Sequence, residues 1–376
     1  MRLAVPTIQS ASSAPLFRAC NTHRRILSPH GRYGRHLSKE QVSELVAPPP
    51  DVLELVHAWL EHHGVRPSTI SMEHGGSLLT LSGVPVSRAN NLLNASYQLY
   101  QHIGTNDTVL RTLSYGLPAV LLAHVQTVIP TTHFGFPRAP GQKPLMRFGG
   151  EAFSEKVAAG ERGTASLSSR DLYVSPSLLR WQYNTFDYVP SATHLNVLGV
   201  TGYFGQYPSP DDLRLFMDKY RTDGDYATFT VIQVNGGGND PSNPGFEANM
   251  NIQYTQAMVY PTTVVFYSTG GGRTPGENDA FITWLKYVLS RTNVPQTIST
   301  SYSADEHFVP QDHAIYLCSL YAQLGVRGAS VLFSSGNDGV GEGNCQFEDS
   351  SGNTYVRFIP TFPSTCTCRI SSLRLL

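Results

Sequence analysis

The sequence has no excess of charge of either sign and no apolar run long enough to cross a bilayer. Its 27 Lys and Arg residues balance 28 Asp and Glu residues, so it lacks the basic excess of nucleic-acid and anionic-membrane binders. The longest apolar run, at 116–122, is soon interrupted by His124 and Gln126, far short of the roughly 20 residues of a spanning helix. We expect no nucleic-acid partner and no membrane contact.

Cysteine is scarce, and its spacing predicts no metal centre. The five cysteines lie at positions 20, 318, 345, 366 and 368 and form no pair of CxxC motifs at zinc spacing. The 13 histidines include no HExxH motif. We therefore expect no metal site within the chain. One disulfide in an oxidising compartment and a set of buried free thiols are both compatible with these positions.

The N-terminal residues lack acidic side chains. The first 39 residues contain seven Lys or Arg and no Asp or Glu, which is typical of an organelle transit peptide but also of a ragged or misassigned start. No secretory signal peptide is recognisable, because the apolar stretch at 3–8 is short and contains Pro6. Two glycosylation sequons, at Asn94 and Asn106, favour secretion.

The sequence pattern predicts a compact α+β domain over residues 31–136 and leaves residues 1–30 unassigned. Ser38 and Gln41 can form a capping box at the start of a helix. Asp51 can cap a second helix, whose apolar residues recur at helical spacing. Further runs predict two strands and another helix, at 69–72, 78–81 and 87–93.

Residues 137–172 predict an exposed linker. They are rich in Gly, Pro, Ser and charged residues and contain few large apolar groups. Because such a backbone is solvated and unpaired, we expect a proteolytic processing site within it.

Residues 173–366 alternate strands and helices and predict a parallel sheet covered by helices on both faces. Apolar, β-branched runs predict strands at 195–200, 228–234, 263–267, 297–302 and 329–333. Helical patterns lie between them at 210–221, 246–259, 278–290 and 311–325. Sites in such folds lie at the carboxyl ends of the strands. The glycine runs that follow the strands match no phosphate-binding spacing, so we expect them to allow close backbone approach.

Three motifs follow strand ends in this second half. Glu247 and Asn251 lie four residues apart in PGFEANMNIQY at 244–254, on one helix face. The others are STSY at 299–302, followed by Asp305 and Glu306, and FSSGNDGVG at 333–341. Together they resemble the sedolisin family of serine-carboxyl peptidases, and in particular its fungal tripeptidyl-peptidase branch.

The first half resembles the pro-kumamolisin-type activation domain of the same family. The matching stretches are RYGRHLSKEQVSELVAPPPDVLELVHAWLEHHGV at 32–65, VSRANNLLNASYQLYQH at 86–102 and LSYGLPAVLLAHVQTVIPTTHFG at 113–135. The resemblance implies a pro-domain that packs on a subtilisin-like α/β sheet and is removed by cleavage. It also implies a secreted monomer that releases tripeptides from the N-termini of peptide or protein substrates at acidic pH.

The family's chemistry explains these residue types. A glutamate, here Glu247, acts as base for a serine, and an aspartate one turn later shares its proton. Two close carboxylates cannot both ionise cheaply, so the pair works in acid. In this chain the aspartate position is Asn251, which cannot share a proton in that way. The family's SGD aspartate, which donates to the oxyanion, falls on Asn337 or, after a local shift, on Asp338.

The family's nucleophile motif, SGTS, and its later Ca²⁺ ligands do not occur in the 376 residues. The resemblance ends near Cys366, and we expect residues 367–376 to be an aberrant tail that marks a truncation of the peptidase domain. The chain should then be inactive as a peptidase. An alternative is a non-catalytic protein that binds peptides or inhibits proteases through its pro-domain. A disulfide between Cys345 and Cys366 is plausible.

Overall fold

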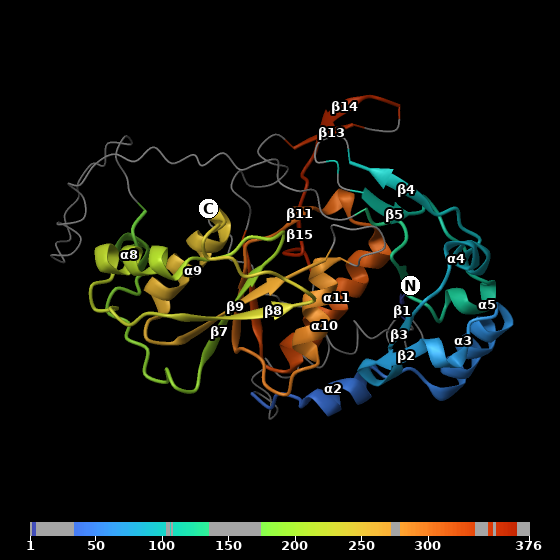
Figure 1. Cartoon of the computed structure of the whole chain (residues 1–376), viewed down its shortest axis with the longest axis horizontal. Helices are drawn as coiled ribbons and strands as arrows, with labels where there is room; N and C mark the ends of the chain where they lie inside the picture. The colour runs from blue at the N-terminus through green and yellow to red at the C-terminus, as the bar shows by residue number, and fades with distance from the viewer. Residues whose placement is uncertain are drawn as a thin grey trace.

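The computed structural model describes residues 2–4, 34–102, 106, 108–134, 174–271, 279–334, 345–348 and 351–366. The whole of the expected linker at 137–172 lies outside the described residues, as do the tail at 367–376 and most of residues 1–30. Figure 1 shows the helices and sheets as successive layers, with the N-terminal elements on the right and the parallel sheet near the centre.

The second half of the chain is built on a five-stranded sheet in which every neighbouring pair is parallel. The strand order is β12-β10-β7-β9-β8. The strands are β7 (Val197–Gly202), β8 (Phe229–Val234), β9 (Thr263–Thr269), β10 (Thr297–Thr300) and β12 (Ser330–Phe333). The predicted α/β class and all five predicted strands are confirmed, with ends shifted by a few residues.

Helices cover both faces of this sheet, as predicted. Val264 and Phe266 of β9 pack in one cluster with α8 (Pro210–Tyr220) and α9 (Phe246–Val259). Tyr267, which points to the opposite face because side chains alternate along a strand, packs with α10 (Ala280–Leu289) and α11 (Gln311–Val326).

The N-terminal part contains a four-stranded antiparallel sheet in the order β2-β3-β1-β6. Its strands are β1 (Arg2–Ala4), β2 (Ile70–Glu73), β3 (Leu78–Leu81) and β6 (Thr127–Ile129). On one face, Leu79 and Val128 pack with α3 (Pro50–His62) and α4 (Val86–Leu93). On the other face, Leu78 and Ile129 join the cluster of α10 and α11. The helix pair α10 and α11 therefore lies between two sheets (Figure 1).

The remaining elements are short and lie around these layers. They are α2 (Lys39–Val46), the 3₁₀ turns Pro67–Thr69, His74–Gly76 and Glu306–Phe308, β4 (Gln98–Gln101), β5 (Thr108–Arg111), α5 (Ala119–Leu122), α7 (Pro176–Gln182), β11 (Ala304–Asp305), β13 (Gln346–Glu348), β14 (Thr354–Val356) and β15 (Thr361–Phe362).

The N-caps predicted for α2 and α3 can be compared with the structure. The capping box of α2 is confirmed: Gln41 N donates to Ser38 Oγ at 3.2 Å, and Ser38 N donates to Gln41 Oε1 at 2.9 Å. The expected Asp51 cap is wrong, because α3 begins at Pro50 and Asp51 lies in its first turn. Proline at the first helical position has a fixed φ suited to the helix and no orphan amide, so α3 starts two residues earlier than an Asp51 cap would imply.

Two glycines after strand ends allow close backbone approach, as predicted for the glycine runs. A Cβ on Gly237, after β8, would lie 2.0 Å from the Ser268 carbonyl oxygen, and one on Gly270, after β9, would lie 2.5 Å from that of Asn235. No other residue type fits such contacts without moving a loop.

Helix α11 is buried on all sides because it lies between the two sheets. Twelve of its 16 residues are buried, whereas the amphipathic α8 buries only Leu213 and Met217. A helix that is apolar all round is typical of such interior positions. None of the described helices combines the length and the apolar composition needed to cross a membrane.

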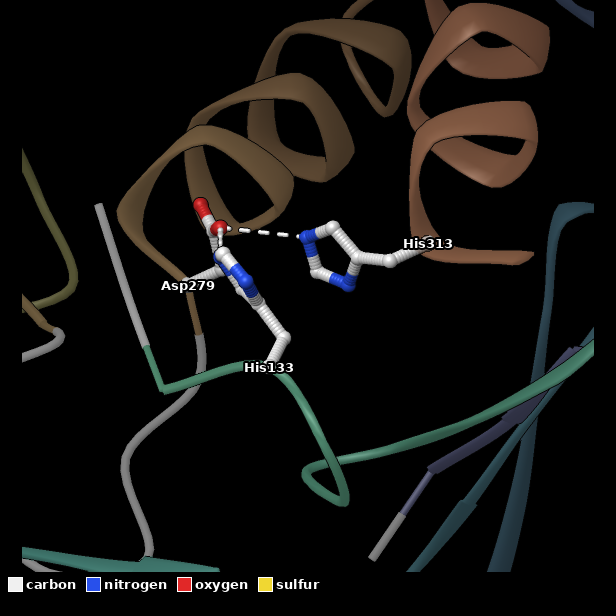
Figure 2. Close-up of side chains that lie close together, drawn as sticks. All are labelled: His133, Asp279 and His313. Carbon is white, nitrogen blue, oxygen red and sulfur yellow. Dashed lines mark hydrogen bonds and ion pairs between the residues drawn. The ribbon is translucent and has the colours of Figure 1, made fainter. Parts of the chain in front are cut away.

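Polar contacts join the N-terminal part to the helix pair. The hydroxyls of Tyr115 and Thr127 donate to Asp312 Oδ2 at 2.9 and 2.7 Å. Lys286 Nζ of α10 lies 2.7 Å from Glu73 Oε2 of β2. A third contact brings His133 beside Asp279 and His313 (Figure 2). The interface therefore combines apolar packing, through Leu78 and Ile129, with polar contacts between defined pairs of side chains.

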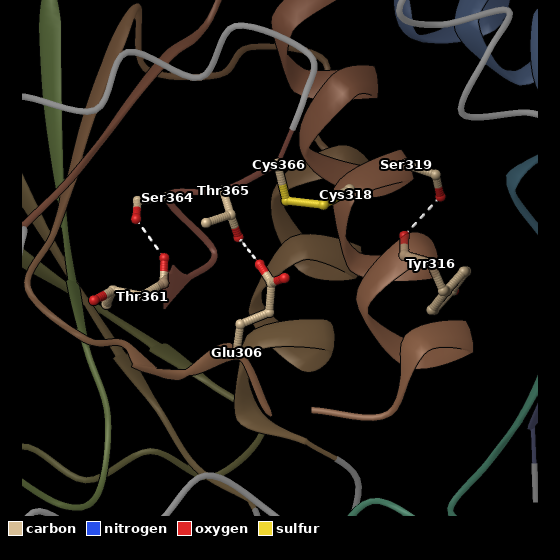
Figure 3. Close-up of a disulfide and its surroundings, with 8 residues drawn as sticks. All are labelled: Glu306, Tyr316, Cys318, Ser319, Thr361, Ser364, Thr365 and Cys366. Atoms are coloured by element: carbon tan, nitrogen blue, oxygen red, sulfur yellow. Dashed lines mark hydrogen bonds between the residues drawn. A yellow bond between two sulfur atoms is a disulfide. The ribbon is translucent and has the colours of Figure 1, made fainter. Parts of the chain in front are cut away.

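The disulfide joins Cys318 of α11 to Cys366, with the two Cα atoms 5.3 Å apart (Figure 3). The expected Cys345–Cys366 pairing is therefore wrong. The prediction paired cysteines on either side of one loop, but β15 pairs with β11 and brings Cys366 beside α11. Thr365 Oγ1 also donates to Glu306 Oε2 beside the disulfide.

Breaking the Lys286–Glu73 pair should lower the free energy of unfolding. Lys286 is only 8% exposed, so Glu73→Gln leaves a buried ammonium without its carboxylate and should cost about 2 kcal/mol. Asp218→Asn is the matched control, because it breaks the exposed Arg214–Asp218 pair of α8 and should cost less than about 0.5 kcal/mol. Urea denaturation measures both. Equal losses would contradict the stabilising role of the Lys286–Glu73 pair.

Candidate functional site

Glu247 lies in the first turn of α9, close to the carboxyl end of the parallel sheet. The N-cap of α9 is Gly245, which has no side chain to cap the helix. Instead, Gln206 Oε1 accepts from the amide of Glu247 at 2.9 Å. A Cβ at Gly245 would lie 2.5 Å from that oxygen, so glycine makes room for the substitute cap. This contact holds Glu247, which is 8% exposed, in a fixed position.

Asn251 and Ser301 complete a small polar cluster with Glu247. Asn251 lies one turn after Glu247 on the same face of α9, and Ser301 follows the end of β10. Ser301 Oγ donates to Asn251 Oδ1 at 3.0 Å. The structure thus brings the two helix residues beside the motif at 299–302, from another strand end.

Burial controls the electrostatics of this cluster. It raises the pKa of Glu247, and the nearby Asn251 and Ser301 side chains oppose that rise. Asn251 Nδ2 is buried and has no partner in good hydrogen-bonding geometry among the described residues. Burial also raises the pKa of Tyr302, and the charge of Glu247 adds to that rise.

Other buried polar atoms near the sheet's carboxyl ends also have no hydrogen-bond partner among the described residues. They include the hydroxyls of Thr269, at the end of β9, and Thr300, at the end of β10. Buried polar groups are almost always paired in folded proteins. Unpaired groups at this edge are suited to receive a polar ligand or water.

The cluster can act as a proton acceptor in mild acid. A carboxyl whose pKa is raised by burial exchanges its proton closer to neutrality than an exposed glutamate. Asn251 has a side-chain amide, which cannot share the proton of Glu247 as a carboxylic acid at this position could. Ser301 supplies a hydroxyl beside the pair, which donates a hydrogen bond to Asn251 Oδ1.

The expected oxyanion residues, Asn337 and Asp338, lie outside the described residues. Ser334, the last described residue before them, has its amide bonded to the Thr300 carbonyl at 3.2 Å. The sequons fall on the surface, since Asn94 and Asn106 are both exposed.

A second cluster was missed by sequence reasoning. His133, Asp279 and His313 are all buried, and both imidazole Nε2 atoms contact Asp279 Oδ2, at 3.1 and 3.2 Å. They come from the segment after β6, the N-cap of α10 and the first turn of α11. No local motif links three residues so far apart in the chain, so only the fold identifies them.

Comparisons with known proteins match both halves. The sequence profile of the family "Pro-kumamolisin, activation domain" matches residues 24–134. Tripeptidyl-peptidase SED2 of Arthroderma otae is 31% identical over 350 residues, which cover 89% of this chain and 57% of the relative. A probable tripeptidyl-peptidase SED3 of Arthroderma benhamiae is 31% identical over 354 residues, covering 90% of this chain and 57% of the relative.

The chain thus spans little more than half the length of these relatives. Among solved structures, Pseudomonas sedolisin, a serine-carboxyl proteinase complexed with two molecules of pseudo-iodotyrostatin, matches with a TM-score of 0.35 and 16% identity over 52% of this chain and 51% of that chain. Residues 24–134 thus resemble a pro-kumamolisin activation domain, and most of the chain is similar in sequence to part of the fungal tripeptidyl-peptidases.

Proposed function

We propose that the chain belongs to a serine-carboxyl peptidase that releases tripeptides from free N-termini at acidic pH. The observation that carries this proposal is the buried Glu247 in the first turn of α9, with Asn251 one turn later and Ser301 bonded to it. The similarity to tripeptidyl-peptidases supports the substrate class.

In this proposal Glu247 is the general base for a serine hydroxyl, and Asn251 takes the place of the partner acid. The oxyanion donor is Asn337 or Asp338. No serine of the 376 residues lies in an SGTS motif, and the resemblance assigns the Ca²⁺ ligands to sequence beyond that motif. The 376-residue polypeptide by itself therefore has no peptidase activity.

The proposal also gives the activation domain and the linker a role in proteolytic processing of the chain. Residues 31–136 hold the helix pair α10–α11 as a pro-domain, and cleavage within 137–172 separates them from the peptidase part at 173–366. The exposed sequons at Asn94 and Asn106 support secretion of the protein, which we expect to be monomeric and to act on peptides or proteins.

Asn251→Asp should restore a pair of interacting carboxyls. A second negative charge beside Glu247 raises the folded-state pKa further. A carboxyl with a raised folded pKa contributes stability below its unfolded pKa, about 4.3, and that stability is lost as the pH rises through the folded value. The variant should therefore lose more unfolding free energy than wild type between acidic and neutral pH, measured by urea denaturation.

The matched control is Asn91→Asp, which makes the same substitution at an exposed position of α4. It should change the pH dependence much less. If Asn251→Asp and Asn91→Asp behave alike, Asn251 is not coupled to Glu247.

Activity is tested with a chromogenic tripeptide reporter in mildly acidic buffer. The 376-residue chain should release no product. A chimera that appends the C-terminal part of a related tripeptidyl-peptidase should cleave the reporter, and Glu247→Gln in it should lower kcat at least about 100-fold. Cleavage by the 376 residues alone, or an active chimera insensitive to Glu247→Gln, would contradict the assignment.

A second candidate function is inhibition of a peptidase by the activation domain. The contacts of Asp312 with Tyr115 and Thr127 favour it, because they join the N-terminal part to α11 through defined hydrogen bonds. We expect the chain to lower the activity of an active fungal tripeptidyl-peptidase at micromolar concentration. No inhibition at that concentration would remove this function.

A further inference from the structure

The cluster of His133, Asp279 and His313 lies at the interface between the activation domain and the helix pair, away from Glu247. His133 follows the last strand of the activation domain, whereas Asp279 and His313 lie at the starts of α10 and α11. All three side chains are buried. One oxygen and two ring nitrogens, all potential ligand atoms, lie within 4.8 Å of one another.

The spacing of these atoms matches a tetrahedral zinc site. Zinc binds imidazole nitrogen and carboxylate oxygen at about 2.0–2.1 Å, which places two ligands of a tetrahedron about 3.3 Å apart. The two Nε2 to Oδ2 distances are 3.1 and 3.2 Å. Both separations are within a few tenths of an ångström of that tetrahedral spacing, and a water molecule would be the fourth ligand.

The donor set suits a cation. Imidazole nitrogen and carboxylate oxygen are both zinc ligands, and the three side chains that carry them are buried together. The adjoining cavity is lined by a second carboxylate, Asp312, and by one guanidinium, Arg111.

Neighbouring groups fix the orientation of the candidate ligands. Asp279 Oδ1 accepts from the Phe281 amide at 2.7 Å, which leaves Oδ2 for the histidines. Arg111 Nε donates to the His133 carbonyl at 2.5 Å and anchors that segment. Such outer contacts are usual around metal ligands.

We propose that His133, Asp279 and His313 bind one Zn²⁺ ion, which fastens the activation domain to α10 and α11. One ligand comes from the activation domain and two from the helix pair. The ion is thus a cross-link between the two halves of the chain and takes no part in peptide hydrolysis.

Hydrogen bonds alone are the competing explanation of this cluster, and a paired substitution separates the two. Replacing both residues, as His133→Gln and His313→Gln, keeps an N–H donor for Asp279 at each position but removes both imidazole ligands. His62→Ala is the matched control, because His62 is an exposed histidine of the activation domain.

Zinc and cobalt binding to the purified 376-residue chain test the proposal. We expect one Zn²⁺ per chain by isothermal titration, a higher Tm with zinc that a chelator reverses, and the visible absorption of tetrahedral Co²⁺. The double glutamine variant should bind at least about 100-fold more weakly, since even outer-shell changes cost 10–100-fold. His62→Ala should bind as wild type does.

Three results would overturn the proposal. They are no stoichiometric zinc on wild type, equal affinity in the double variant, or a thiolate-to-cobalt charge-transfer band that assigns the metal to cysteine. If the double variant does not fold, as judged by circular dichroism, the single His133→Gln variant decides by the same affinity criterion.

Discussion

The packing of two sheets on one pair of helices is the constraint on which the rest of the structure depends. Helices α10 and α11 cover the parallel sheet with one side and the antiparallel sheet of the activation domain with the other. Removing apolar surface from water is the main favourable term in folding. Because both halves bury residues against the same helices, their stabilities are coupled through side chains such as Leu78, Ile129 and Tyr267.

The same arrangement separates two kinds of polar site. Glu247 and Asn251 lie on α9, on the far side of the parallel sheet from the activation domain, and meet Ser301 at the sheet's edge. The Asp279 cluster lies instead within the domain interface. One cluster therefore lies at the carboxyl ends of the parallel strands, and the other lies between the two halves of the chain.

Sequence predicted what is encoded locally. The strand runs were recognisable because a parallel sheet covered on both faces needs continuous apolar segments, and the Ser38 capping box follows from two residues. Glu247 and Asn251 were found through their four-residue spacing within a motif. The Cys318–Cys366 bond and the cluster of His133, Asp279 and His313 were missed because each joins segments that only the tertiary fold brings together.

The burial of α11 on every side also has an evolutionary consequence. A helix with one solvent-exposed face tolerates amino-acid substitutions along that face, as α8 should at the exposed Arg214 and Asp218. Nearly every side chain of α11 is packed against others in the core. A substitution there changes the volume that fills the core, and such changes usually destabilise the folded protein. Divergence between relatives should therefore be slowest along α11, even though this helix contributes no residue to the Glu247 cluster.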